Sequence, residues 1–180
     1  RGLLIERDTV ALDNEVECFI DVAQFQHCLV VCRSHGHPAT DICPRCLEPL
    51  TEAAALYRGD FLAGFSLRDS AGFDDWQFFQ AESARRDLLS VLDRLVRLHS
   101  ERSEFEAAID HARRYLSIDP LHEPAHRALM KLYAQTGQRP AALRQYQECV
   151  RVLKTELSVE PLPETVHVWQ AIKDNQLSTN

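Results

Sequence analysis

The fold of this chain is decided by residues 104–161, which read EFEAAIDHARRYLSIDP (104–120), LHEPAHRALMKLYAQTG (121–137) and QRPAALRQYQECVRVLKTELSVEP (138–161). Each segment carries apolar residues three and four positions apart, which is the spacing of one face of a helix. Each also ends at a helix breaker, namely Asp119-Pro120, Thr136-Gly137 or Glu160-Pro161. Pro cannot continue a helix, and Gly suits the left-handed position just beyond one. The stretch therefore predicts three helices joined by short turns.

The same region contains an internal repeat. Three pairs of residues recur 34 positions apart: Leu95 and Leu129, Phe105 and Arg139, and Ala108 and Ala142. A period of about 34 residues is that of the tetratricopeptide repeat, a helix-turn-helix unit. A small residue at positions 108 and 142 lets two helices approach closely where they cross. We therefore predict an all-α, tetratricopeptide-like helical repeat array; an irregular helical bundle with a chance period is the alternative.

The remaining segments extend this array toward both ends of the chain. LLIERDTVAL (3–12) predicts a short extended N-terminal segment or strand pair, because its apolar residues alternate. Further helices are predicted over about 22–33, 44–59, 75–100 and 163–175, and residues 176–180 are expected to be a frayed tail. Asp21 is predicted to cap the first of these helices, and Asp74-Asp75 the third.

The longest predicted helix needs one buried side. Its apolar stripe comprises Trp76, Phe79, Leu88, Leu89, Leu92, Leu95, Val96 and His99. The connector before it, residues 60–72, carries Phe61, Leu62, Phe65 and Leu67. Apolar runs in a loop usually indicate docking, so we predict that these side chains also pack against the protein.

Composition and charge argue against two classes of function. The chain has 180 residues, of which 45% are hydrophobic, yet no apolar run approaches the roughly 20 residues that span a bilayer. Its 27 acidic and 20 basic residues give a net charge of −7, which argues against nucleic-acid binding, because that affinity comes largely from neutralising phosphates. The sequence lacks a secretory signal pattern and does not begin with Met. We expect a cytoplasmic piece of a longer protein.

Several motifs resemble those of a known family. They are ALYRGDFLAGF (55–65), DPLHEPAHRALM (119–130), G-x-R-x-A-A-L-x-x-Y (137–146) and E-L-x-V-E-P (156–161). From about Phe19 to Ile172 the chain resembles the bacterial transcriptional activator domain of Streptomyces antibiotic regulatory protein-type regulators. The resemblance implies a tetratricopeptide-like helical array that follows a winged-helix DNA-binding domain.

The resemblance also implies a role. It points to a regulatory, protein-interaction domain with no enzyme activity and no small-molecule substrate. Residues 1–18 are then expected to be the end of the winged helix or a linker, and residues 19–175 the activator domain. Since the sequence contains no recognition helix, DNA is expected to bind only through the missing domain. The expected partners are further copies of the chain or the transcription machinery, on the concave side of the array.

One cluster of residues has the character of a metal site. Cys43-Pro-Arg-Cys46 has the C-x-x-C spacing that lets two thiolates hold one ion, and Cys32-x-x-His35 offers a second pair. Zinc takes four such ligands in a tetrahedron. We predict a structural zinc ion held by Cys32, His35, Cys43 and Cys46, which would clip together the helix pair within residues 22–58. Cys28 is the reserve ligand, and His37 is the alternative to His35.

Two other interpretations of this cluster are open. One is a set of buried cysteines beside a solvated histidine loop. The other is a metal-dependent or redox enzyme built on the segment from Cys28 to Cys46, although a thioredoxin-like C-x-x-C belongs with a βαβ pattern that the sequence lacks. A catalytic zinc keeps an open position beside a general base. Packing, capping or surface roles are expected for the other histidines and the acidic pairs, so no catalytic residue is predicted.

Overall fold

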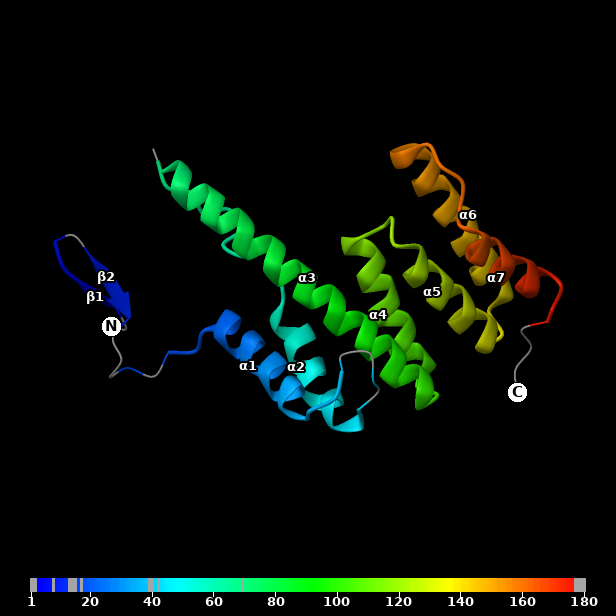
Figure 1. Ribbon diagram of the computed structural model, residues 1–180, viewed down its shortest axis with the longest axis horizontal. Helices are drawn as coiled ribbons and strands as arrows, with labels where there is room; N and C mark the ends of the chain where they lie inside the picture. Colours follow the sequence, from blue (N-terminus) through cyan, green and yellow to red (C-terminus); the bar gives the residue numbers. More distant parts are fainter. Residues whose placement is uncertain are drawn as a thin grey trace.

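The structure is a computed structural model that describes residues 3–7, 9–12, 16, 18–38, 41, 43–68 and 70–176. Within these residues the chain forms a short β-hairpin followed by helices (Figure 1). The hairpin consists of β1 (Leu3–Ile5) and β2 (Val10–Leu12), which pair antiparallel. The helices are α1 (Asp21–Ser34), the short 3-10 helix η1 (Pro44–Cys46), α2 (Leu47–Leu56), α3 (Ala71–Glu101), α4 (Phe105–Ile118), α5 (Glu123–Gln135), α6 (Arg139–Leu157) and α7 (Pro163–Lys173). The predicted all-α fold is confirmed, and the expected frayed tail lies largely outside the described residues.

The helices pack in the order of the chain. Contacts run from α1 to α2, from α2 to α3, and then through α3, α4, α5 and α6 in turn. The last helix, α7, folds back on both α5 and α6. Figure 1 shows α4 beside the second half of α3, with α5 and α6 following in turn on the far side of α4, while the first half of α3 projects beyond them. This projecting half is covered by fewer neighbours than the rest of the array.

The 34-residue repeat is visible in the structure. Helices α4 and α6 begin 34 positions apart, and α3 and α5 end 34 positions apart. Ala108 and Ala142, at equivalent positions of α4 and α6, are both fully buried. Equivalent hydrogen bonds close the two turns: Glu104 N–H donates to the carbonyl of His99 at 2.9 Å, and Gln138 N–H donates to that of Tyr133 at 2.7 Å. The array is therefore built from two equivalent helix-turn-helix pairs.

The two turns place different residues in the same left-handed backbone conformation. Ser103 has φ 57°, and Gly137, one repeat later, has φ 73°. A left-handed residue with a side chain costs roughly 1–2 kcal/mol relative to the ordinary helical conformation, whereas Gly adopts it freely. We expect Ser103→Gly to stabilise the chain by about 1 kcal/mol and Gly137→Ser to destabilise it by a similar amount, measured by urea denaturation. Equal and unfavourable effects from both substitutions would contradict the equivalence of the turns.

The core consists of two apolar clusters. The first joins α1 and α2 to α3 and contains Phe25, Cys28, Cys32, Leu50, Leu88 and Leu92 among its buried members. The second joins α4, α5, α6 and α7 around Ala108, Ile109, Leu129, Met130 and Ala142. Helix α3 supplies residues to both, with Leu88 and Leu92 in the first and Val96 in the second. It therefore connects the N-terminal helix pair to the repeat array.

The first half of α3 departs from the sequence prediction. The helix begins at Ala71, after Ser70, rather than near Asp75, and Asp21 is the first residue of α1 rather than its cap. Trp76 and Phe79 are 46% and 67% exposed, although both were predicted to be buried. Leu62, Phe65 and Leu67 of the connector are exposed as well. The reason is that periodicity identifies an apolar stripe but not whether another element covers it.

Candidate metal centre

The loop between α1 and η1 brings histidine and cysteine side chains together. Helix α1 ends at Ser34, and His35 is its C-cap. Gly36 follows with φ 73°, a left-handed conformation that turns the chain away from the helix axis. At the other end of the loop Cys43 immediately precedes η1, whose first residue is Pro44. Because α1 and α2 pack side by side, the two ends of the loop meet.

Four ligand atoms lie within 4.8 Å of one another, from His35, His37, Cys43 and Cys46. The Cys46 sulfur lies 3.2 Å from Nδ1 of His35 and 3.3 Å from Nε2 of His37. The Cys43 sulfur lies 3.7 Å from Nδ1 of His35. In a regular zinc tetrahedron, bonds of about 2.1 Å to nitrogen and 2.3 Å to sulfur place the ligand atoms roughly 3.4–3.8 Å apart. The observed spacings therefore suit a single tetrahedral ion.

A hydrogen bond outside the four ligand atoms orients His37 for metal binding. Nδ1 of His37 lies 2.8 Å from the carbonyl oxygen of Pro38, to which it donates its proton. This hydrogen bond leaves the lone pair of Nε2 directed at Cys46. A metal-binding histidine usually donates its other ring N–H to a carbonyl or carboxylate, which fixes the tautomer.

The cluster differs from the predicted ligand set in one member. It contains His35, Cys43 and Cys46 as predicted, but His37 stands where Cys32 was expected. Cys32 is only 1% exposed on the inner side of α1, and its thiol lies 4.0 Å from the carbonyl oxygen of Cys46, to which it donates. Cys28, the reserve ligand, is also buried in the first core cluster. Both residues contribute to the packing of α1 against α2 and α3.

The two cysteines of the C-x-x-C pair differ in environment. Partial burial raises the pKa of Cys43, but hydrogen bonds from Arg45 and Cys46 to its sulfur outweigh that effect and lower the pKa to about 7. Burial, followed by the contact with Cys32, raises the pKa of Cys46 to about 12. Burial also lowers the pKa of His35, and the positive charge of Arg45 adds to this shift. With a pKa of about 7, roughly half of the Cys43 side chains are thiolates at neutral pH, and the lowered pKa of His35 favours its neutral ring; these are the forms that bind metal ions.

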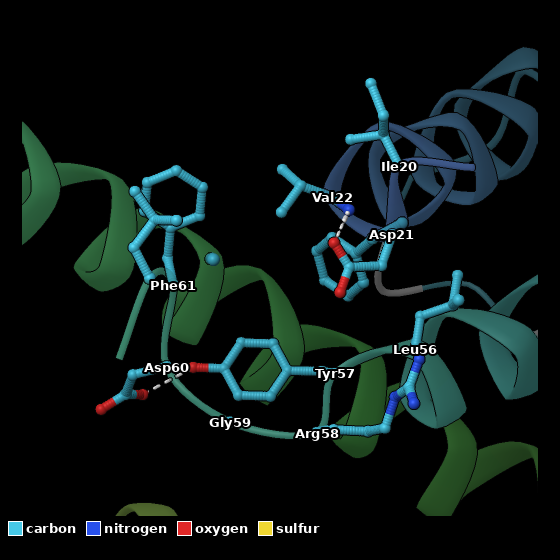
Figure 2. Close-up of a pocket in the computed structure, with 12 residues that line it drawn as sticks. Ile20, Asp21, Val22, Leu56, Tyr57, Arg58, Gly59, Asp60 and Phe61 are labelled. Atoms are coloured by element: carbon cyan, nitrogen blue, oxygen red, sulfur yellow. Dashed lines mark hydrogen bonds between the residues drawn. The ribbon is translucent and has the colours of Figure 1, made fainter. Parts of the chain in front are cut away.

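A second feature lies at the opposite end of α1 and α2. A cavity of about 640 Å³ opens between the first turn of α1, the end of α2 with the connector that follows it, and α3. Figure 2 shows Ile20 and Val22 on one side and Tyr57, Gly59 and Phe61 on the other. The remaining lining residues are Asp21, Phe25, Leu56, Arg58, Asp60, Leu62 and Ala84. The cavity is therefore mainly apolar, with charged groups among its lining.

Hydrogen bonds hold the connector side of this cavity in place. The Tyr57 hydroxyl donates to Asp60 at 2.8 Å, and Arg85 of α3 pairs with the same carboxylate at 2.7 Å. The Tyr57 hydrogen bond and the Arg85 charge together lower the pKa of Asp60. From α4, Arg114 donates to the carbonyl oxygens of Ala54 and Tyr57 and so caps the end of α2. The cavity wall is thus attached to both α3 and α4.

Comparison with known proteins identifies the helical part of the chain. A family model described as the bacterial transcriptional activator domain matches residues 20–173. This chain belongs to that family. A solved structure with a similar fold is the C-terminal TPR-containing domain of a candidate FK506-binding protein from Plasmodium falciparum. It is 12% identical, with a TM-score of 0.56, and the match covers 88% of this chain and 93% of that one. No curated protein matches the chain significantly.

The bacterial transcriptional activator domain thus has the helical repeat fold that the sequence predicted, and the family resemblance is confirmed. No helix among the described residues is long and apolar enough to cross a membrane. The six cysteines of the chain, of which all but Cys18 lie in the domain, form no disulfide with one another. The histidines expected to have packing roles include His126, which is buried and hydrogen-bonded to the Pro120 carbonyl at 2.9 Å and to Gln145 at 2.7 Å.

Sequence reasoning missed one buried polar group of the activator domain. The carboxylate of Glu123, at the start of α5, accepts hydrogen bonds from the backbone N–H of Leu162 at 2.9 Å and from the hydroxyl of Thr165 at 2.5 Å. Arg127 donates to the same hydroxyl at 3.0 Å. Both Glu123 and Thr165 are buried. The only signal in the sequence was an acidic residue before Pro124, which an exposed helix start explains equally well.

Proposed function

We propose that this chain is the regulatory, protein-interaction half of a bacterial transcription activator and that it acts in the cytoplasm without enzyme activity of its own. The family match over residues 20–173 is the observation that carries the proposal. Stacked helical repeats also present extended surfaces that other proteins recognise. DNA binding then belongs to a winged-helix domain outside this sequence, for which residues 1–18 would be the end or a linker.

The proposed partner is the transcription machinery, represented by purified bacterial RNA polymerase. The apolar cavity between α1, α2 and α3 has the size of sites that accept bound apolar groups. We expect immobilised chain to bind RNA polymerase and Val22→Asp, at the cavity edge, to weaken binding by about tenfold or more. The matched control is Val30→Asp, the same substitution at an exposed valine of α1 that does not line the cavity. Equal affinities for wild type and both variants would contradict this placement.

We expect this chain alone to form no sequence-specific complex with DNA. Its net charge of −7 repels the phosphate backbone, and the recognition helix that the family resemblance implies is expected outside this sequence. A gel-shift titration at physiological salt, using promoter fragments and a random duplex of equal length, measures this directly. Tight binding that differs between promoter and random duplex would show that the DNA-binding surface lies in the chain itself.

We further propose that His35, His37, Cys43 and Cys46 hold a structural zinc ion. The proximity of the four ligand atoms supports this set, in which His37 replaces the Cys32 expected from sequence. Four protein ligands complete a tetrahedron and leave no position for substrate, which favours a structural centre over the alternative metalloenzyme. The ion would join the end of α1 to the start of α2 and so orient the helix pair that forms one wall of the cavity.

A further inference from the structure

The first half of α3 carries an exposed stripe that is self-complementary in charge. Asp75, Phe79, Glu82 and Arg86 are spaced four, three and four positions apart, so they lie along one face of the helix. This face is opposite the side that contacts the connector, where Gln77 donates to the carbonyl of Leu62 at 2.8 Å. We call these four residues the α3 stripe.

The α3 stripe has Phe79 and Glu82 at its centre and unpaired charged side chains at its ends. Phe79 is 67% exposed, and Phe78 beside it is 60% exposed; their rings contact each other with centroids 5.8 Å apart. Glu82 pairs with Arg85 of the same helix at 2.8 Å. The side chains of Asp75 and Arg86 have no ion pair or hydrogen bond with any part of the chain that the structure describes. Two exposed aromatic rings between a free anion and a free cation indicate an interface.

The spacing of the charges selects the partner. Asp75 and Arg86 lie at equal distances on either side of the midpoint between Phe79 and Glu82. In an antiparallel pair of identical helices centred on that midpoint, Asp75 of each copy faces Arg86 of the other. In the same register Phe79 of each copy faces Glu82 of the other, so the two Phe79 rings lie on either side of the twofold axis, beside the aliphatic part of the facing Glu82. This is the self-complementary arrangement that a twofold dimer requires, in which residue i contacts j and j contacts i.

The shape of the molecule permits this pairing. Asp75 and Arg86 are about 16 Å apart along the helix axis, at 1.5 Å per residue. Figure 1 shows this half of α3 projecting beyond α4, α5 and α6. Because the paired helices run in opposite directions, the C-terminal half of each α3 and the array packed on it extend away from the twofold axis on opposite sides. The two repeat arrays do not compete for the same space.

We propose that two copies of this chain associate through the α3 stripe, as an antiparallel helix pair held by Phe79 and by reciprocal contacts between Asp75 and Arg86. The inference deepens the proposed role in protein interaction, of which it specifies one partner. A single helix pair buries less than the roughly 800 Å² per partner of a standard interface. The dimer is therefore weak, with a dissociation constant in the micromolar range.

Sedimentation velocity of the purified chain, from about 1 to about 200 μM, tests the proposal. We expect the wild-type mass to rise from monomer to dimer over this range and no further, because a twofold pair is closed. Phe79→Asp, at a largely exposed position, should remain monomeric with an unchanged far-ultraviolet circular dichroism spectrum. Asp75→Arg and Arg86→Asp should each raise the dissociation constant by about tenfold or more.

The decisive variant combines the two charge reversals. Asp75→Arg with Arg86→Asp restores both reciprocal pairs, so we expect it to dimerise within about threefold of wild type. Asp74→Arg, the neighbouring exposed acid outside the α3 stripe, is the matched control and should not weaken the dimer. A wild type that stays monomeric, a double variant as weak as the single ones, or a control as weak as Asp75→Arg would each overturn the proposal. This experiment contains no polymerase, so a monomeric result overturns only the proposed dimer. The proposed binding to RNA polymerase is decided by its own experiment.

Discussion

Removal of the metal is expected to destabilise the N-terminal helix pair more than any surface substitution would. Protein purified without added zinc should contain about one equivalent of zinc per chain. A ligand that binds only the folded state at a thousand times its dissociation constant stabilises that state by about 4 kcal/mol. We therefore expect chelation to lower the unfolding midpoint and to increase amide hydrogen exchange in α1, η1 and α2. Exchange in α4, α5 and α6 should stay protected, because their core cluster is separate from the metal centre.

Substitutions distinguish the ligand set in the structure from the one predicted by sequence. Cys43→Ser and His37→Asn should each lose the metal, since each removes a member of the cluster. Cys32→Ala should retain it, although it costs some packing in the core. Cys18→Ser, at an exposed cysteine outside the cluster, is the control and should change neither metal content nor stability. Loss of metal in Cys32→Ala together with retention in His37→Asn would favour the ligand set predicted from sequence. Wild-type protein that contains no metal would instead support the interpretation of the cluster as buried cysteines beside a solvated histidine loop.

The difference between these ligand sets shows what the sequence can and cannot resolve. Spacing alone identified the segment, because C-x-x-C and a nearby histidine pair restrict the possible ligands strongly. It selected Cys32 and kept His37 only as the alternative to His35, whereas the structure groups His37 with His35, Cys43 and Cys46, because membership depends on how the loop closes. One signal did favour His37: Cys32 lies on the same apolar stripe of α1 as Phe25 and Leu29, and all three are buried in the structure. A cysteine on a core-facing stripe is already used in packing.

The repeat array was predictable because its determinants are local. Breakers at Thr136-Gly137 and Glu160-Pro161 ended helices where the structure ends them, within a few residues. The exposure of Trp76 and Phe79 was not predictable, because it depends on whether other elements reach the first half of α3. In the structure the connector covers one side of that half through Phe61, whose ring meets Trp76 with centroids 5.4 Å apart. The opposite side stays exposed, and the prediction of a fully buried stripe was wrong there.

The attachment of α7 was likewise hidden from sequence reasoning, because the groups involved are far apart in the chain. The buried carboxylate of Glu123 satisfies the Leu162 N–H and the Thr165 hydroxyl at the start of α7. At the other end of the helix, Arg139 of α6 donates to the carbonyl oxygen of Ile172 at 3.1 Å. The side chains of α5 and α6 therefore satisfy groups at both termini of α7, beyond the apolar contacts of Val168 and Ile172.

Glu123→Ala is accordingly expected to destabilise the chain by roughly 2–4 kcal/mol, because it leaves the part-buried N–H of Leu162 and the buried hydroxyl of Thr165 without their acceptor. Glu123→Gln keeps one acceptor oxygen and should cost about half as much. Glu164→Ala, at an exposed acidic residue in the first turn of α7, is the control, with an expected cost of about 0.5 kcal/mol from the helix dipole. Urea denaturation measures the totals, and amide exchange within α7 shows whether this helix opens before α5 and α6. If Glu123→Ala and Glu164→Ala cost the same, or if exchange rises equally in all three helices, the buried carboxylate is not what holds α7 to the array.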